Sequence, residues 1–393
     1  MRKVRSIILK EKYLTKDMLR VIARVSHIKR DRPAPKQVPK FYEFMNSAKI
    51  ISGYRAMDNI PKELRERGLN KPLLITQHDF LEKGVLKTLI KTLVNFGVDA
   101  RSILLCPKNS NQDAKEKAIL EFENLSCDSI IAIGGEAAFK LAKAICNLYS
   151  NIKKGFGSIL YIAVPVAKGV LEITDNPNII VLDPRLGKDQ PPKVIALCSI
   201  DAICHAVATF INPMKNPLSD AYAFSSLNLI RDNVHKALKS GKDKRVNLSI
   251  LNAFLLSSLA FTDSNLSLSH LLSGVLENCY KISHQEIIAI IFPHILNQGL
   301  LKFDEYYGEL LLPLAGHEIY ADTIPYERGR KFVQLVRNMV SDYHQIYGFP
   351  KCLSEIGVKR QDFDIIIERT LNQAENHNED LEEDIRNILN FAF

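Results

Sequence analysis

Short aliphatic and β-branched runs alternate with amphipathic stretches between residues 72 and 184. The runs are Leu73–Thr76, Ser102–Cys106, Ser129–Ile133, Ile159–Val164 and Asn178–Leu182. The stretches Leu81–Phe96, Ala114–Glu123 and Ala137–Tyr149 have apolar residues three and four apart, which predicts helices. Strands that alternate with helices favour a parallel sheet covered by helices on both faces. The pattern therefore predicts a doubly wound α/β domain of the nucleotide-binding type.

The pattern changes after Asp183-Pro184, where no further strand is predicted. The chain to Phe393 has helical spacing throughout, interrupted at Pro191-Pro192, Pro217, Pro293 and Gly348-Phe349-Pro350. We therefore expect an all-α C-terminal domain and a domain boundary near residue 185. The expected organisation is an N-terminal extension over residues 1–40, an α/β domain over 41–185 and a helical domain over 186–393.

The N-terminal extension holds the positive charge of the chain. Residues 1–40 contain thirteen Lys and Arg against three acidic residues, which leaves 39 basic and 41 acidic residues elsewhere. Nucleic-acid binding by the folded body is therefore not supported. Tyr13–Arg30 has the spacing of a basic amphipathic helix, and 31–39 that of a linker. Packing of this helix against the body is favoured over contact with an anionic membrane surface or a protein partner.

Composition places the chain among globular proteins, with 393 residues, 46% hydrophobic and 24% charged. No apolar run reaches the roughly 18 residues that a membrane-spanning helix needs, and no secretory signal is apparent. We therefore expect a cytoplasmic protein. The seven cysteines are odd in number and form no Cys-x-x-Cys pair, so neither a disulfide framework nor a thiolate zinc site is indicated.

Four side chains in the helical region are candidate metal ligands: Asp201, His205, His270 and His284. Asp201 and His205 are four residues apart, so both would project from one face of a helix. Taken singly, such a pair is more often a surface or capping interaction, and a lone histidine more often a hydrogen-bonded core residue. Together, one carboxylate and three imidazoles would suit Zn²⁺ or Fe²⁺ and leave a coordination position for a substrate oxygen.

A second candidate site is the turn Gly134-Gly135, where a predicted strand ends and a helix begins. Paired glycines let the backbone approach a diphosphate, and the free amides of the helix N-terminus favour its negative charge. The same two glycines could equally form a simple tight turn.

From about residue 40 to the C-terminus the chain resembles the iron-containing alcohol dehydrogenase family, which shares its architecture with glycerol dehydrogenase and dehydroquinate synthase. The matching segments, in order, are Cys127 to Gly135, Ala142-Lys143, Ile162 to Pro165, Val181 to Pro184, Asp201 to Ala206, Asn216 to Asp220, His284 to His294, Gly348 to Pro350 and Leu353 to Val358. The ordered set is far more specific than any one of its members.

The resemblance implies a dehydroquinate synthase-like fold, a divalent metal in the cleft and a nicotinamide cofactor, NAD or NADP. It places the metal ligands on Asp201, His205, His270 and His284 and the diphosphate at Gly134-Gly135. It further implies a small alcohol or aldehyde as substrate, hydride transfer at the metal-bound oxygen, and a homodimer.

The departures from the family pattern cluster around the expected cofactor. Glu136 replaces a glycine and places a carboxylate near the diphosphate, with Lys140 one turn further on as a compensating charge. Lys168 stands in a shortened loop that lacks its usual hydroxyls. Gln77 replaces an acidic residue at the adenosine ribose, and Gly274 replaces a histidine near the substrate.

Two hypotheses therefore compete. The first is a metal-dependent NAD(P)-linked alcohol or aldehyde oxidoreductase. The second is a diverged, non-catalytic or altered-cofactor member that keeps the fold and the metal site but has lost normal dinucleotide binding. A third, weaker hypothesis keeps catalysis on a different cofactor or a phosphorylated substrate, with Lys140 and Lys168 binding the phosphate.

Overall fold

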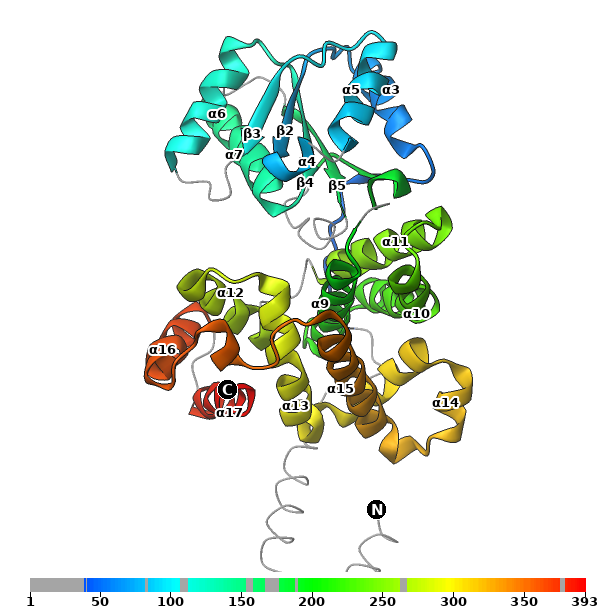
Figure 1. Ribbon diagram of the computed structural model, residues 1–393, viewed down its shortest axis with the longest axis vertical. Coiled ribbons are helices and arrows are strands. Elements are labelled where there is room, and N and C mark those ends of the chain that lie inside the picture. The colour runs from blue at the N-terminus through cyan, green and yellow to red at the C-terminus, as the bar shows by residue number, and fades with distance from the viewer. Residues whose placement is uncertain are drawn as a thin grey trace, which may run out of the picture.

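The computed structural model describes residues 39, 41–81, 84–106, 112–152, 158–166, 177–187, 190–261, 267–374 and 379–393. Within these ranges six parallel strands form one sheet in the order β1-β6-β5-β4-β2-β3 (Figure 1). The strands are β1 (Lys49–Ser52), β2 (Pro72–Gln77), β3 (Ile103–Cys106), β4 (Ser129–Gly134), β5 (Leu160–Pro165) and β6 (Ile179–Leu182). The predicted fold class is confirmed, and β1 is the one strand that the pattern missed.

Helices cover both faces of the sheet, as the alternation predicts. Leu73 and Ile130 face α6 (Gln112–Asn124) and α7 (Glu136–Ile152), whereas Leu74 and Ile131 face η1 (Ala56–Asn59), α3 (Ile60–Arg65) and α5 (Val85–Asn95). The helix expected over Leu81–Phe96 is instead divided into α4 (His78–Leu81) and α5. Gly84, in a left-handed conformation with φ of 70°, is the N-cap of α5 and separates the two.

The order of the strands creates a topological switch point. From β2 the chain passes to β3 on one side and then returns to β4 on the other. Gln77 ends β2 and Gly134 ends β4, so both residues lie at the carboxyl edge beside this point. Open parallel sheets bind ligands in the crevice at such an edge.

The second half of the described chain contains helices and no strand. Its α-helices are α9 (Pro192–Ile211), α10 (Pro217–Lys239), α11 (Lys244–Phe261), α12 (Leu268–Tyr280), α13 (His284–Ala315), α14 (His317–Asp322), α15 (Arg328–Tyr347), α16 (Phe363–Gln373) and α17 (Glu379–Ala392). The 3-10 turns are η2 (Pro184–Gly187), η3 (Pro325–Glu327), η4 (Leu353–Ile356) and η5 (Arg360–Asp362). The expected boundary near residue 185 falls in η2, between the last strand and α9.

Helix α9 is the central element of the helical region. It contacts α10, α11, α13 and α15, and its residues from Ile195 to Phe210 are all buried. By length and composition α9 and α13 could each cross a membrane, which corrects the expectation that no segment is apolar enough. The most apolar window of α9 is 89% buried inside the protein, however, and α13 is kinked at Phe303. The apolar character of α9 is therefore accounted for by packing.

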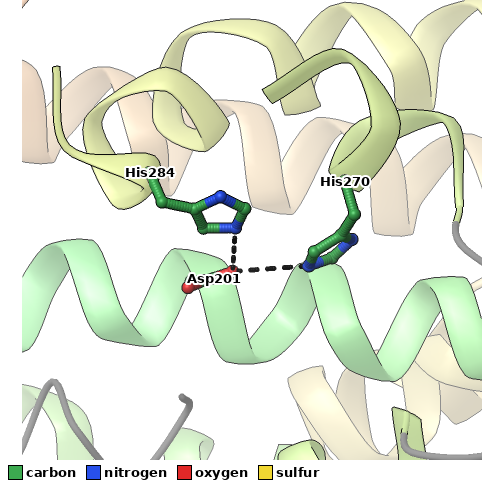
Figure 2. A group of neighbouring side chains, drawn as sticks. All are labelled: Asp201, His270 and His284. Carbon is green, nitrogen blue, oxygen red and sulfur yellow. Dashed lines mark ion pairs between the residues drawn. The ribbon is translucent and has the colours of Figure 1, made fainter. Parts of the chain in front are cut away.

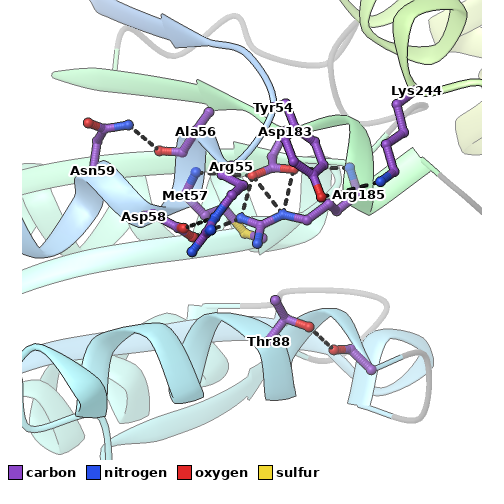
Figure 3. A network of polar contacts seen from close by, with 11 residues as sticks. Tyr54, Arg55, Ala56, Met57, Asp58, Asn59, Thr88, Asp183, Arg185 and Lys244 are labelled. Carbon is purple, nitrogen blue, oxygen red and sulfur yellow. Dashed lines mark hydrogen bonds and ion pairs between the residues drawn. The ribbon is translucent and has the colours of Figure 1, made fainter.

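Polar contacts hold the end of the sheet beside η2, and one of them reaches the helical region (Figure 3). Asp183 is fully buried, and its carboxylate accepts hydrogen bonds from the Met57 amide at 3.2 Å and from Arg185 Nη2 at 2.7 Å. Arg185 also bonds Asp58 at 3.0 Å, and these carboxylates, Asp183 first, raise the pKa of the guanidinium. Lys244 on α11 donates to the Tyr54 hydroxyl at 3.2 Å. The end of the sheet is thereby fixed against the helices.

The chain before β1 also contacts the helical region. Phe44 packs edge-on against Tyr222 of α10, with ring centroids 5.5 Å apart. The segment before β1 therefore packs on the helical region, although the sequence analysis assigns it to the α/β domain. The expected basic helix Tyr13–Arg30 lies outside the described residues.

We predict that Asp183→Ala lowers the free energy of unfolding by about 3 kcal/mol, because it leaves the Met57 amide without its acceptor and the Arg185 guanidinium with Asp58 alone. Chemical denaturation followed by circular dichroism measures the change. The control is Asp232→Ala, which breaks an exposed pair with Arg231 and should cost below about 1 kcal/mol. Equal losses of unfolding free energy in the two variants would show that the contacts of Asp183 stabilise the fold no more than an exposed ion pair does.

Candidate metal centre and nucleotide crevice

The Asp201 carboxylate is the centre of the candidate metal site. It lies in the middle of α9 and is only 1% exposed. The Nε2 atoms of three histidines surround its Oδ1 atom, His205 at 3.6 Å, His284 at 3.8 Å and His270 at 4.0 Å. Figure 2 shows His270 of α12 and His284 of α13 turned toward this oxygen from two sides. The structure thus brings together all four residues that the sequence proposed as ligands.

These distances fit atoms that share a cation better than atoms that bond one another. Each exceeds the usual length of a hydrogen bond. Two ligand atoms about 2.1 Å from one metal ion at a tetrahedral angle lie roughly 3.4 Å apart. Asp201 Oδ1 and His270 Nε2 are buried and lack a hydrogen-bond partner within the described chain. Such unpaired atoms facing one another are expected where a cation completes the site.

The tightest part of the arrangement contains three of the four residues. One ligand atom from each of Asp201, His270 and His284 lies within 4.8 Å of the others. His205 is not part of this group, although its Nε2 is the nitrogen nearest to Asp201 Oδ1. Its ring is stacked on Phe261, with centroids 4.7 Å apart and planes 3° apart. Phe261 therefore fixes the plane of the His205 ring.

Burial keeps two of the imidazoles in the form that can bind a metal. Desolvation, followed by the charge of His284, lowers the pKa of His205 to about 3. Desolvation, with smaller contributions from His205 and His284, also lowers the pKa of His270 well below its usual value. Both rings are therefore neutral near pH 7 and present nitrogen lone pairs.

A second layer of polar side chains orients the candidate ligands. Ser267 and Ser269 approach His270 Nδ1 at 2.9 and 3.3 Å, and Ser273 approaches His284 Nδ1 at 3.2 Å. Sequence analysis missed these serines, although each lies within three residues of His270 in the chain. Partners on Nδ1 leave Nε2 free to face the common centre, which is the arrangement of ligating histidines.

Two further contacts secure the carboxylate and the helices. Gln285 follows His284, and its Nε2 donates to Asp201 Oδ2 at 3.3 Å, so only Oδ1 faces the imidazoles. Lys193 in the first turn of α9 pairs with Glu286 in the first turn of α13 at 2.9 Å. Ser283 caps α13 by accepting from the Glu286 amide at 3.3 Å. The start of α13 is thus fixed beside α9.

The expected diphosphate turn lies in the sheet domain, at the switch point. Gly134 has φ of 127°, a conformation that favours glycine, and its carbonyl accepts from the Val166 amide at 3.0 Å. Gly135 precedes α7, so its amide is one of the free donors at a helix N-terminus. The Gln77 side chain accepts a hydrogen bond from this amide at 3.3 Å. Gln77, Gly134 and Gly135 therefore meet at one point.

The remaining residues expected near the cofactor are Lys140, Lys168 and Glu136. Lys140 lies on α7, one turn after its start, with an exposed side chain. Lys168 lies outside the described residues, as does the side chain of Glu136. The structure therefore brings together Gln77 and the two glycines and leaves the lysine contacts as predictions.

Known proteins resemble this chain over most of its length. The NAD-dependent methanol dehydrogenase of Bacillus methanolicus is 24% identical over 358 residues, which are 82% of this chain and 91% of the relative. Long-chain-alcohol dehydrogenase 1 of Geobacillus thermodenitrificans (strain NG80-2) is 24% identical over 380 residues, 87% of this chain and 94% of the relative.

Solved structures share the fold. A 1,3-propanediol oxidoreductase superposes with a TM-score of 0.79 at 20% identity, over 90% of this chain and 100% of its own. An alcohol dehydrogenase from Oenococcus oeni gives 0.77 at 21% identity, also over 90% and 100%.

Two family models cover the chain in succession. Residues 47–183 match the iron-containing alcohol dehydrogenase model, and residues 195–393 match the model of the C-terminal part of the Fe-containing alcohol dehydrogenase family. Together with the relatives, these matches indicate an oxidoreductase of alcohols or aldehydes. The chain belongs to the iron-containing alcohol dehydrogenase family.

Proposed function

We propose that this protein is a metal-dependent, NAD(P)-linked oxidoreductase of a small alcohol or aldehyde. The observation that carries the proposal is the buried Asp201 Oδ1 atom, which faces the Nε2 atoms of His205, His270 and His284 at 3.6 to 4.0 Å. The relatives bear the names of enzymes that act on alcohols, including methanol and long-chain alcohols, and one of them is NAD-dependent.

Asp201, His205, His270 and His284 would hold a divalent cation, Fe²⁺ or Zn²⁺. One oxygen and three nitrogen donors suit either ion. When bound, such a cation polarises a carbonyl group and favours ionisation of a hydroxyl group. The protein supplies the orientation. Ser267 and Ser273 hold two of the rings by their Nδ1 atoms, and Gln285 turns Asp201 so that a single oxygen faces the centre.

The glycine turn would hold the diphosphate of a nicotinamide dinucleotide, which supplies or accepts hydride. Gly134 has no side chain at the crevice, and Gly135 presents an amide at the start of α7. Both properties suit a diphosphate that approaches the backbone. A negatively charged phosphate is a stronger acceptor for this amide than the neutral Gln77 side chain.

Gly274 would provide space for the substrate. It lies one turn after His270 on α12, and nothing lies within 4 Å of the position that its Cβ would occupy. A glycine here supplies no group for proton transfer. Water, a substrate hydroxyl or the ribose of the cofactor would then transfer the proton.

The diverged, non-catalytic member is the second candidate, and one observation favours it. The Gln77 side chain already accepts the hydrogen bond of the Gly135 amide, which a phosphate would need. Binding of nicotinamide nucleotides therefore separates the two candidates.

We predict that His270→Ala lowers metal affinity by more than about 100-fold, because it removes a ligand rather than an outer partner. Metal content after dialysis is measured by elemental analysis. His235→Ala is the matched control, since His235 is an exposed residue of α10. Unchanged metal content in His270→Ala would show that the ligand assignment is wrong.

We predict that Ser273→Ala weakens metal binding by about 10- to 100-fold, because Ser273 is the hydroxyl found at His284 Nδ1 in the described chain. Ser267→Ala should have a smaller effect, since Ser269 also approaches His270 Nδ1. Competition with a chromophoric chelator measures both affinities. A larger loss in Ser267→Ala than in Ser273→Ala would contradict this order.

We predict that the protein loaded with Fe²⁺ or Zn²⁺ reduces short aldehydes with NADH or NADPH, and that removal of the metal by a chelator abolishes turnover. Absorbance of the reduced nicotinamide measures the rate. Restoration by the added ion, and not by Mg²⁺, is expected from the nitrogen-rich donor set. A protein that holds metal but binds neither nucleotide at millimolar concentration would refute the oxidoreductase proposal and support the second candidate.

A further inference from the structure

The crevice above the glycine turn is filled by side chains from the segment that follows β2. A Cβ placed on Gly134 would lie 2.9 Å from Phe80 Cε2 and 3.1 Å from Gln77 Oε1. Gln77 is the last residue of β2, and Phe80 lies in α4. The two side chains therefore cover Gly134 from across the switch point.

The segment that follows β2 also accepts the hydrogen bond that a phosphate would need. The Gly135 amide stands at the start of α7, and Gln77 Oε1 accepts its hydrogen bond at 3.3 Å. The Gly135 amide has one hydrogen, so it cannot donate a well-aligned hydrogen bond to a phosphate oxygen and to Gln77 Oε1 at the same time. A ligand that reaches the turn must displace Gln77.

Phe80 adds a steric and apolar component to this cover. It is partly buried and packs against the apolar core that includes Leu74, Ile131 and Ile133. Moving the ring off Gly134 would give up part of this packing. The closed arrangement is thus stabilised independently of any ligand.

We infer that Gln77 and Phe80 form a displaceable cover over the phosphate-binding turn, and that the cover weakens the binding of nicotinamide dinucleotides. The inference rests on the proposed function, since it concerns the cofactor of that function. When a site is competent for only part of the time, the apparent dissociation constant rises by the inverse of that fraction. Loss of either side chain should therefore increase affinity.

The test compares four variants of the full-length, metal-loaded protein with the wild type. The chain contains no Trp, so binding of NADH is followed by nicotinamide emission and by calorimetry. A net hydrogen bond corresponds to roughly a three- to tenfold change in an equilibrium constant. We expect Gln77→Ala and Phe80→Ala each to lower the dissociation constant of NADH by about this factor.

Two variants serve as controls. Gln77→Met keeps the length of the side chain but removes its amide, so it should bind NADH more tightly than the wild type if the hydrogen bond to the Gly135 amide is the cause. Phe96→Ala removes an exposed ring at the end of α5 and should leave the dissociation constant unchanged. Circular dichroism and metal content establish that each variant is folded. Should Phe80→Ala fail this check, Gln77→Ala carries the test, because Gln77 lies outside the apolar core clusters.

The outcomes separate the cover from the proposed function. Tighter binding in Gln77→Ala or Phe80→Ala supports the cover. If the wild type binds NADH as tightly as both variants or more tightly, the cover is ruled out and the oxidoreductase proposal is unaffected. If neither the wild type nor either variant binds NADH, the cover is not what weakens nucleotide binding. The nicotinamide cofactor is then removed from the proposed function as well.

Discussion

The buried carboxylate of Asp201 is the constraint around which the helical region is built. An ionised carboxylate without compensation is very unfavourable inside a protein. Here α9 carries it at 1% exposure, and Gln285 satisfies only one of its two oxygens. The other faces imidazoles whose own burial favours their neutral form. Neutral rings do not balance the charge of an ionised carboxylate, and the cation of the proposed function would supply the missing positive charge.

This requirement explains why three helices that are distant in the sequence meet at one point. Helix α9 is buried on all sides from Ile195 to Phe210 and carries Asp201 beside the first turns of α12 and α13. Ser267 is the N-cap of α12, yet its hydroxyl approaches His270 rather than capping the helix. The helix start thus gives up some local stability to hold a ligand, which is expected at functional sites.

The fold was predictable where the periodicity was strong, and the site was predictable where the residue types were distinctive. Strands β2, β4, β5 and β6 are buried aliphatic runs. Both edge strands have exposed side chains, but β3 is still an apolar run (Ile-Leu-Leu-Cys), whereas the two isoleucines of β1 stand between Lys49 and Ser52 and give no such pattern. The four candidate ligands stand out by residue type. The serines and Gln285 that orient them do not, because such residues occur throughout a soluble surface and act here only through their position in space. The sequence also could not place Gln77 on the glycine turn, since that contact joins the ends of two strands 58 residues apart.

The two sites differ in how far they are organised in advance. The candidate ligands already point at a common centre, and partners on Nδ1 orient His270 and His284, as suits an ion that stays bound through many reaction cycles. The crevice at the switch point is instead closed by the chain's own amide and ring. A dinucleotide that enters and leaves in each cycle does not require a permanently open site, provided that the cost of opening is only a few times the thermal energy. Under the proposed function, the metal centre would be preorganised, whereas the binding free energy of the diphosphate would offset the cost of opening the nucleotide crevice.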